Sequence, residues 1–231
     1  MATRKRKAEQ GFQVGAALRD NSLTLVLLAA FAVSLLGQAL TGWQVENREA
    51  VKHGGHVADL ATYLVSASFL SALFENWESE FLQMAAYVVL TACLFQRGSP
   101  ESRDPDRPEA DEAETKQHTG RVPWPARVGG FVTALYARSL GIALALLFLI
   151  CFALHLVASA SAAREEAVRH GWRAGSLAEH LGDAQFWFES FQNWQSEFLS
   201  TAVLIILSIF LRQRGSPESK PVGAPHAQTG D

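Results

Sequence analysis

Two long runs of uncharged, mostly apolar residues stand out along the chain. The first extends from Ser22 to Gly42 and the second from Ser139 to Ala163. Each is longer than the roughly 20 apolar residues that an α-helix needs to cross a bilayer. A soluble core helix of this length would normally carry charged residues on its exposed face. Both runs are therefore predicted to be transmembrane helices.

Each apolar run is followed by a polar turn and then by a second helical pattern. Residues 57–96 contain no proline or glycine, and one helix of that length would extend about 60 Å, too far for a single crossing. We therefore predict a lateral helix at 57–75, either interfacial or re-entrant, and a second span at about 77–96. The second half repeats this plan, with a lateral helix at 174–190 and a span at 194–212.

The two halves of the chain are copies of one unit. The sequence FENWESEFL at 74–82 returns as FQNWQSEFL at 191–199, and QRGSPES at 96–102 returns unchanged at 213–219. One offset of 117 residues relates the copies without a gap from Ser22 to Ser102. Because each copy is predicted to cross the membrane twice, both copies should enter it in the same orientation, as parallel repeats.

The predicted fold class is an all-α membrane protein with four transmembrane helices, arranged as two tandem two-span repeats that each carry an additional interfacial helix. The expected domains are a basic cytoplasmic tail (1–18), a first repeat (19–98), a linker rich in acidic residues and proline (99–126), a second repeat (127–215) and a C-terminal tail (216–231). The linker and the C-terminal tail are expected to be disordered because they cannot bury enough apolar surface to fold.

Basic residues are distributed unevenly about the predicted spans. Most of them lie in the two tails, in the linker and at the span ends beside these segments, whereas few lie in the polar turns after the two long runs. By the positive-inside rule, both termini and the linker are expected in the cytoplasm.

The overall charge and the cysteine content exclude some classes of protein. A net charge of −3 argues against a nucleic-acid partner, because nucleic-acid binders are normally basic. The expected partner is the lipid bilayer, and a homo-oligomer is also compatible with the sequence. Cys93 and Cys151 fall inside apolar helices, and the chain has no CxxC metal motif. No cofactor is expected.

One polar face recurs in the second span of each copy, as expected from the 100° step of an α-helix. It comprises Asn76, Ser79 and Glu80 in the first copy and the identical residues Asn193, Ser196 and Glu197 in the second. Glu75 and Glu78 point elsewhere, and glutamine replaces both in the second copy. Two interpretations of the recurring face remain open: hydrogen bonds that hold helices together, and an ion, proton or ligand site between the copies.

The most polar side chain inside each long run is Gln38 in the first copy and its counterpart His155 in the second. Both lie toward the outer end of the span, where Gln38 could pair with Glu80 and His155 with Glu197. A buried histidine is more often a hydrogen-bonded packing residue than a ligand. We include both residues in the candidate polar intramembrane site.

A second, weaker candidate is a metal site outside the membrane. Glu49 and His53, and likewise Glu166 and His170, are four residues apart and would share one helical face. Four such side chains could bind a metal. Glycine follows each histidine, however, and an imidazole near the last carbonyls of a helix is a favourable cap. We prefer the cap interpretation and assign no metal.

The motifs FENWESEFLQ and RQRGSPES, joined by a short apolar run, resemble a family of uncharacterised bacterial membrane proteins known only as a domain of unknown function. The residues that carry the resemblance are Phe74, Asn76, Trp77, Ser79, Glu80, Phe81, Leu82 and Gly98 to Ser102, with their second-copy equivalents. The resemblance covers about residues 20–103 and 130–226. It implies a bacterial plasma (inner) membrane protein and no particular activity.

These observations favour an integral membrane protein with a structural or interaction role. The alternative is a small transporter or channel with a polar ion or proton site between the two repeats. The chain has no glycine-rich phosphate loop, GxSxG or HExxH motif, so we do not expect an enzyme.

Overall fold

A computed structural model describes residues 18–104 and 122–230 of the chain, and these residues contain helices and turns but no strand. The basic tail expected at 1–18 and the linker expected at 99–126 fall mostly outside the described residues. The chain divides into two compact units, residues 1–69 and 70–231, and each unit is described here by itself.

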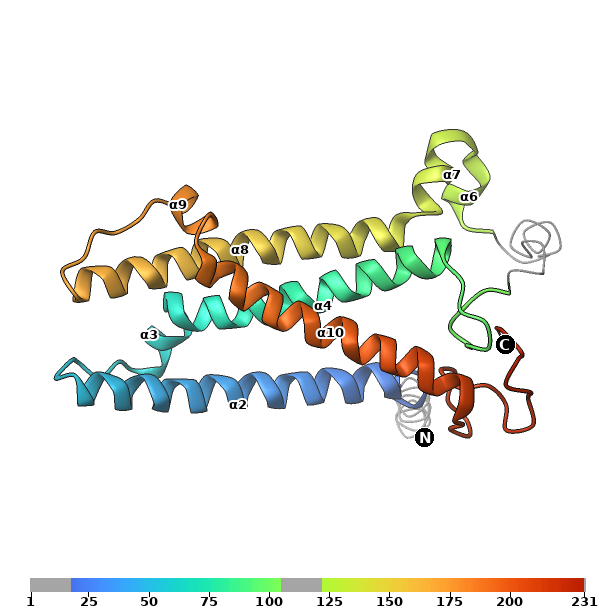
Figure 1. Cartoon of the computed structure of the whole chain (residues 1–231), viewed down its shortest axis with the longest axis horizontal. Coiled ribbons are helices and arrows are strands. Elements are labelled where there is room, and N and C mark those ends of the chain that lie inside the picture. The colour runs from blue at the N-terminus through green and yellow to red at the C-terminus, as the bar shows by residue number, and fades with distance from the viewer. Residues whose placement is uncertain (1–17, 105–121, 231) are drawn as a thin grey trace, which may run out of the picture. The chain divides into compact units, whose positions relative to one another are not determined.

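The first unit contains a long helix, α2 (Ser22–Lys52), and a short helix, α3 (Leu60–Leu64) (Figure 1). The loop between them folds back onto α2, because the Trp43 indole and the Asn47 amide both donate to the Ala58 carbonyl, at 2.7 and 3.0 Å. Asp59 caps α3 by accepting from the Thr62 amide at 2.7 Å, and hydrogen bonding with the Thr62 side chain and then with its amide lowers the pKa of Asp59. The first long apolar run is therefore one uninterrupted helix that extends ten residues beyond Gly42.

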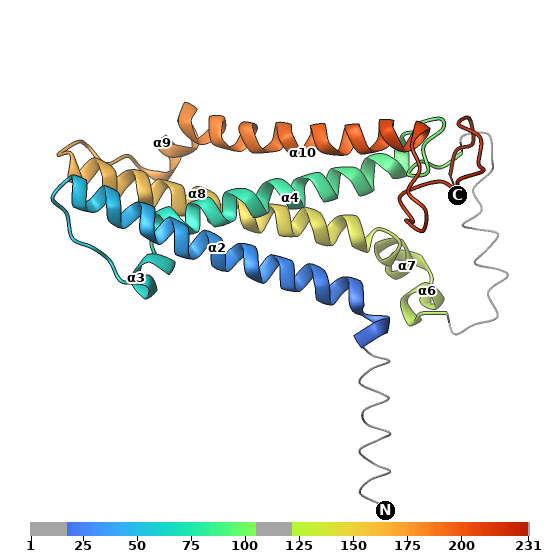
Figure 2. The same ribbon diagram turned by 90° about the horizontal axis from the view of Figure 1, so that it is seen from below.

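The second unit is built on three long helices: α4 (Ala67–Cys93), α8 (Ser139–Arg169) and α10 (Ala184–Phe210). Figures 1 and 2 show them side by side, with α8 running opposite to α4 and α10. Three short helices connect or flank them: α6 (Trp124–Val128), α7 (Gly130–Tyr136) and α9 (Leu177–Leu181).

The long helices of the second unit pack through aromatic and polar side chains. On the α8–α10 side, Phe152 meets Phe186 edge to face, with ring centroids 5.6 Å apart. On the α4–α10 side, the Gln83 amide donates to the Thr201 hydroxyl at 2.5 Å. Between α4 and α8, a Cβ placed at Gly141 would lie 3.4 Å from a Val89 methyl, so glycine allows the close approach of these helices.

The C-terminal tail is tied to the ends of α4 and α10. The Lys220 ammonium is 1% exposed and donates to four backbone carbonyls at 2.5–3.3 Å. These carbonyls belong to Gly98, Pro225, His226 and Gln228. Burial, and secondarily the charge of Arg212, lower the pKa of Lys220. Residues 216–230 were expected to be disordered, and the structure instead folds them into consecutive turns around this lysine.

The lateral helices begin and end elsewhere than the sequence pattern predicts. The helix expected at 57–75 is instead the short α3 followed, after Val65 and Ser66, by the start of α4. The helix expected at 174–190 is likewise the short α9 followed by the start of α10. In α9, Ser176 and Glu179 form a capping box, which lowers the pKa of Glu179 mainly through the Ser176 amide. A break does separate each lateral helix from the long helix that follows it. These breaks lie eight to ten residues earlier in the chain than the hydropathy pattern predicted.

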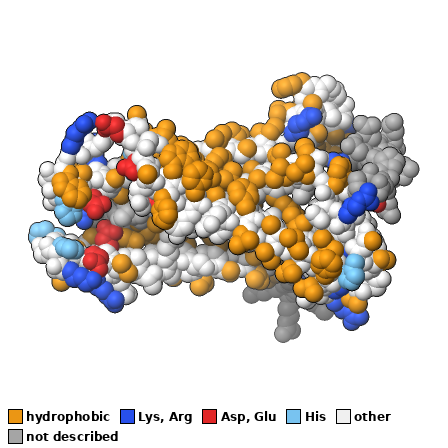
Figure 3. Space-filling view, viewed as in Figure 1, with side chains coloured by type: hydrophobic (Ala, Val, Ile, Leu, Met, Phe, Trp, Pro, Cys, Tyr) orange, Lys and Arg blue, Asp and Glu red, His pale blue; other side chains and the backbone are white. Residues whose placement is uncertain are grey.

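Three helices of the described residues, α2, α8 and α10, are long and apolar enough to cross a membrane. Their apolar side chains point largely outward; on α8 these include Leu146, Leu149 and Ile150. Figure 3 shows hydrophobic side chains over the middle of α8 and α10, with charged side chains toward the ends. α4 is 27 residues long, but three glutamates in its N-terminal half reduce its hydropathy. The protein is therefore an all-helical, membrane-type protein.

Candidate functional site

A buried hydrogen bond between a histidine and a glutamate joins α4 to α8 inside the second unit. The His155 imidazole Nδ1 lies 2.9 Å from Glu78 Oε2, and both side chains are 0% exposed. Because the carboxylate can only accept, Nδ1 carries the proton and donates it to Glu78. Burying two such groups in an apolar bundle is costly unless they pair, and this arrangement pairs them.

The third helix completes the surroundings of this pair. The Trp194 indole of α10 donates to Glu78 Oε1 at 3.1 Å, so both oxygens of Glu78 accept a hydrogen bond. The His155 ring packs against Phe186, with ring centroids 5.0 Å apart. His155 is thus held from two sides, and its orientation in the bundle is determined.

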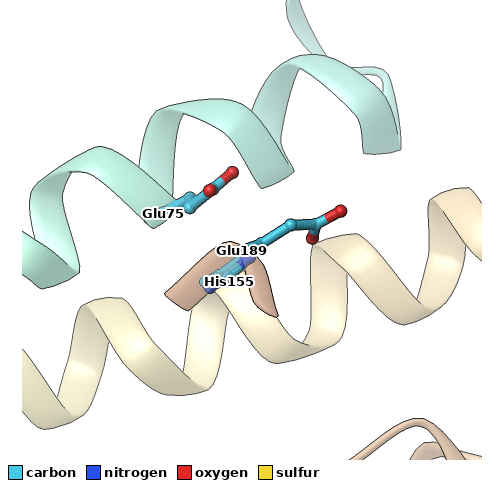
Figure 4. A group of neighbouring side chains, drawn as sticks. All are labelled: Glu75, His155 and Glu189. Atoms are coloured by element: carbon cyan, nitrogen blue, oxygen red, sulfur yellow. The ribbon is translucent and has the colours of Figure 1, made fainter. Parts of the chain in front are cut away.

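Two more carboxylates face the same histidine. Glu75 of α4, His155 of α8 and Glu189 of α10 each offer one ligand atom, and these atoms all lie within 4.8 Å of one another. Figure 4 shows the three side chains lying near one another between their helices. The Asn193 amide donates to Glu75 Oε1 at 2.6 Å, and the Gln185 amide donates to Glu189 Oε1 at 2.8 Å. We call Glu75, Glu78, His155 and Glu189 the carboxylate–histidine cluster.

The electrostatics of the cluster are unbalanced. It sets three carboxylates against one imidazole, and Glu75 interacts electrostatically with His155, Glu189 and Glu78. Glu78 and His155 are buried, while Glu75 and Glu189 are half-buried. The buried Nε2 of His155 has no hydrogen-bond partner among residues 18–104 and 122–230. The cluster therefore has excess negative charge and one nitrogen lone pair available to a positively charged species.

The cluster combines residues of both sequence repeats. The positions that correspond to its members in the opposite repeat do not form a second such cluster. An offset of 117 residues maps its four members onto Gln38, Ala72, Gln192 and Gln195. Every ionisable group of the cluster therefore has a neutral counterpart. A comparison that looked for positions where the copies differ in charge, rather than for positions where they agree, would have found Glu75, Glu78 and Glu189.

The structure places the members of the predicted polar face separately. Asn76 bonds back to the Ala72 carbonyl at 2.7 Å, and Ser79 is buried and donates to the Asn76 carbonyl at 2.8 Å. Ser196 likewise donates to the Asn193 carbonyl of its own helix. Of these residues, Asn193 is the one that binds a member of the cluster.

His155 bonds to Glu78 and not to Glu197, the partner that the sequence suggested. Glu80 is exposed and Glu197 is half-buried, and the two carboxylates repel each other. Glu78 takes the place expected for Glu197, because the face of α4 that meets α8 lies nearly opposite the recurring polar face. Gln38 is half-buried in α2 of the first unit.

The glutamate–histidine pairs lie at helix ends. His53 is the C-cap of α2 and His170 is the C-cap of α8. Glu49 binds Lys52 at 2.6 Å and lies 3.9 Å from His53, and all three side chains are exposed. His170 stacks on Trp172, with ring centroids 5.0 Å apart, and Glu166 is exposed.

Comparison with known proteins gives a family but no activity. Residues 14–231 match a family described as Domain of unknown function (DUF6766). No curated protein and no solved structure matches the chain.

Proposed function

The chain belongs to the DUF6766 family, and we propose that it is a small, non-catalytic membrane transporter that takes up cations or protons at the carboxylate–histidine cluster. One observation supports this proposal above all: three carboxylates, one buried and two half-buried, surround a single buried histidine.

Charge balance is the physical argument. If all three carboxylates are ionised, a neutral His155 leaves three negative charges in the cluster, and a protonated one leaves two. Uncompensated charge in an apolar bundle is expensive, so the cluster should recruit protons or a cation. A hydrogen bond that only holds α4 to α8 requires Glu78 and His155 alone. It does not account for the two further carboxylates, Glu75 and Glu189, beside the same histidine.

The membrane topology belongs to the same proposal. We propose that α4 crosses the membrane in addition to α2, α8 and α10, which gives two parallel two-span repeats. The membrane would be a bacterial inner membrane, with both termini on its cytoplasmic side. A 27-residue helix is about 40 Å long, more than the roughly 30 Å of a bilayer core. In this topology the cluster lies toward the outer ends of α4, α8 and α10.

A structural or interaction role is the second candidate. The bond between Gln83 and Thr201 joins α4 to α10 without any titratable group, as expected of helix-to-helix adhesion. Such bonds explain packing, but they do not explain the excess carboxylates of the cluster.

Ion flux into proteoliposomes tests the transport proposal. The full chain is reconstituted with an entrapped dye that responds to pH, Na⁺ or Zn²⁺, and a gradient of the matching ion is imposed in turn. We expect at least one ion to enter faster than into empty liposomes. Glu78→Gln should abolish this additional ion entry, because it removes a negative charge and the hydrogen-bond acceptor of His155.

Glu80→Gln is the matched control, since it makes the same chemical change two residues away at an exposed position. It should leave the flux within the error of the wild type. If wild-type liposomes admit none of the three ions faster than empty ones, the transport proposal is wrong and the structural role becomes the better account.

A further inference from the structure

The histidine of the cluster has one ring nitrogen still to be assigned a role. Nδ1 donates to Glu78, which fixes the tautomer and leaves Nε2 as a lone pair. Nε2 is buried, and none of the described residues forms a hydrogen bond with it. A buried nitrogen lone pair without a donor normally costs stability, so its retention suggests a ligand.

Two carboxylates flank the same imidazole. Glu75 and Glu189 each use Oε1 to accept from a side-chain amide, which leaves Oε2 to bind a cation. The ligand atoms of these carboxylates and of His155 lie within 4.8 Å of one another. Ligands of a tetrahedral zinc ion are about 3.4 Å apart, given metal–ligand distances near 2.0–2.2 Å. Small rotations of two glutamate side chains would close the difference.

We propose that His155 Nε2, Glu75 and Glu189 bind one divalent first-row transition-metal ion, such as Zn²⁺. This rests on the proposed function, since the ion is the cation that the cluster takes up. An imidazole nitrogen favours transition metals over Mg²⁺ and Ca²⁺, which prefer oxygen ligands only. Three protein ligands leave a fourth position for water, as in zinc sites that exchange a ligand.

Glu78 is a positioning residue in this site and not a ligand. A metal-binding histidine almost always donates its second nitrogen to a carboxylate or carbonyl, which fixes the ring and raises its basicity. Glu78 fills that role at 2.9 Å, and Trp194 in turn holds Glu78. The divalent ion would reduce the three negative charges of the cluster to one.

The repeat predicts a single site of this kind per chain. The counterparts of the three ligands are Gln38, Ala72 and Gln192, and that of Glu78 is Gln195. None of these is a common zinc ligand. Replacing a ligand by its counterpart therefore makes a conservative variant that the same fold already carries elsewhere.

Equilibrium titration of the purified full chain in detergent micelles tests the proposal. Co²⁺ is followed by the visible absorption of a low-coordinate ion, and Zn²⁺ by competition with a chromophoric chelator. We expect one ion per chain. Glu78→Gln should weaken binding by roughly 10–100-fold, the usual contribution of a group that orients a ligand. His155→Gln and Glu75→Gln should weaken it further, and Glu80→Gln should leave it unchanged.

The outcomes separate this inference from the transport proposal. Zn²⁺ binding that requires His155, without flux of H⁺, Na⁺ or Zn²⁺, supports the metal site and contradicts transport. Proton flux without metal binding supports transport and overturns the metal site. The metal site is also overturned if wild-type protein binds neither Co²⁺ nor Zn²⁺, or if His155→Gln protein binds Zn²⁺ as tightly as wild type. Helicity and gel-filtration profile identify a misfolded variant, and the wild-type stoichiometry decides the matter without any variant.

Discussion

At the residue scale, the protein concentrates its chemistry in side chains that differ between the two repeats. Glu78 is the centre of this difference: it holds His155 and Trp194, whereas the equivalent residue, Gln195, is exposed. The sequence singled out His155 correctly as an unusual polar residue in a span. It could not identify Glu78 as the partner, because the rotation of one helix against its neighbour is determined by packing and not by hydropathy.

The first prediction concerns the stability of this pair. Glu78→Gln and His155→Gln should each destabilise the protein by about 3–5 kcal/mol, because each leaves a buried charge or donor without its partner. The double variant should lose less than the sum of the two single losses, by about 0.5–3 kcal/mol, since two glutamines can bond to each other. Reversible unfolding in mixed micelles measures these differences. Strictly additive losses would mean that the two side chains do not interact in solution.

At the element scale, helix boundaries follow capping more closely than hydropathy. The sequence predicted the two long apolar helices that the structure has as α2 and α8, and a break in the helix that follows each polar turn. It made the lateral helices too long, because Asp59 and Ser176 cap short helices that hydropathy does not detect. It also missed the folded tail, because the order of residues 216–230 depends on one buried lysine and its carbonyl partners rather than on apolar surface.

The second prediction uses two equivalent glycines to test the docking of the tail. Gly98 and Gly215 both have φ of +84°, but only at Gly98 would an added Cβ lie 2.6 Å from the His226 carbonyl. Gly215→Ala should cost about 1–2 kcal/mol from backbone strain alone. Gly98→Ala should cost more and should speed protease cleavage of residues 216–230. Equal cleavage rates in the two variants would show that the tail does not dock.

Lys220→Met is the third prediction, and it tests the same docking from the other side. Removing the ammonium leaves four carbonyl groups without their donor, at a cost of about 1–3 kcal/mol for buried unsatisfied groups. Hydrogen exchange of residues 216–230 should become faster. Lys52→Met is the control, because Lys52 is exposed and pairs with Glu49 at the surface. If both variants exchange alike, the lysine does not organise the tail.

At the scale of the whole molecule, the number of spans decides where the termini lie. Three described helices qualify as spans by length and composition, and α4 would be the fourth. Three glutamates lower the hydropathy of α4. Two of these glutamates, Glu75 and Glu78, belong to the carboxylate–histidine cluster. The glutamates that lower the hydropathy of α4 thus include the two that the proposed function requires.

The fourth prediction tests this topology by cysteine labelling in intact cells. In a chain whose two native cysteines are replaced, Val57→Cys and Ala174→Cys should react with a membrane-impermeant maleimide from outside. Val222→Cys should react only after permeabilisation, because four spans return the C-terminus to the cytoplasm. A three-span protein would expose Val222→Cys on the outside while its N-terminus stayed in the cytoplasm, and labelling of that residue in intact cells would contradict four spans.

X-ray absorption at the zinc edge tests the central claim most directly, since it reports the atoms bound to the ion in the full chain. The account predicts a first shell of nitrogen and oxygen near 2.0–2.2 Å, with the multiple-scattering signature of a single imidazole. That signature should disappear in His155→Gln and persist in Glu80→Gln. A first shell that contains sulfur or several imidazoles, or a spectrum that His155→Gln leaves unchanged, would contradict the proposal that the carboxylate–histidine cluster binds the cation.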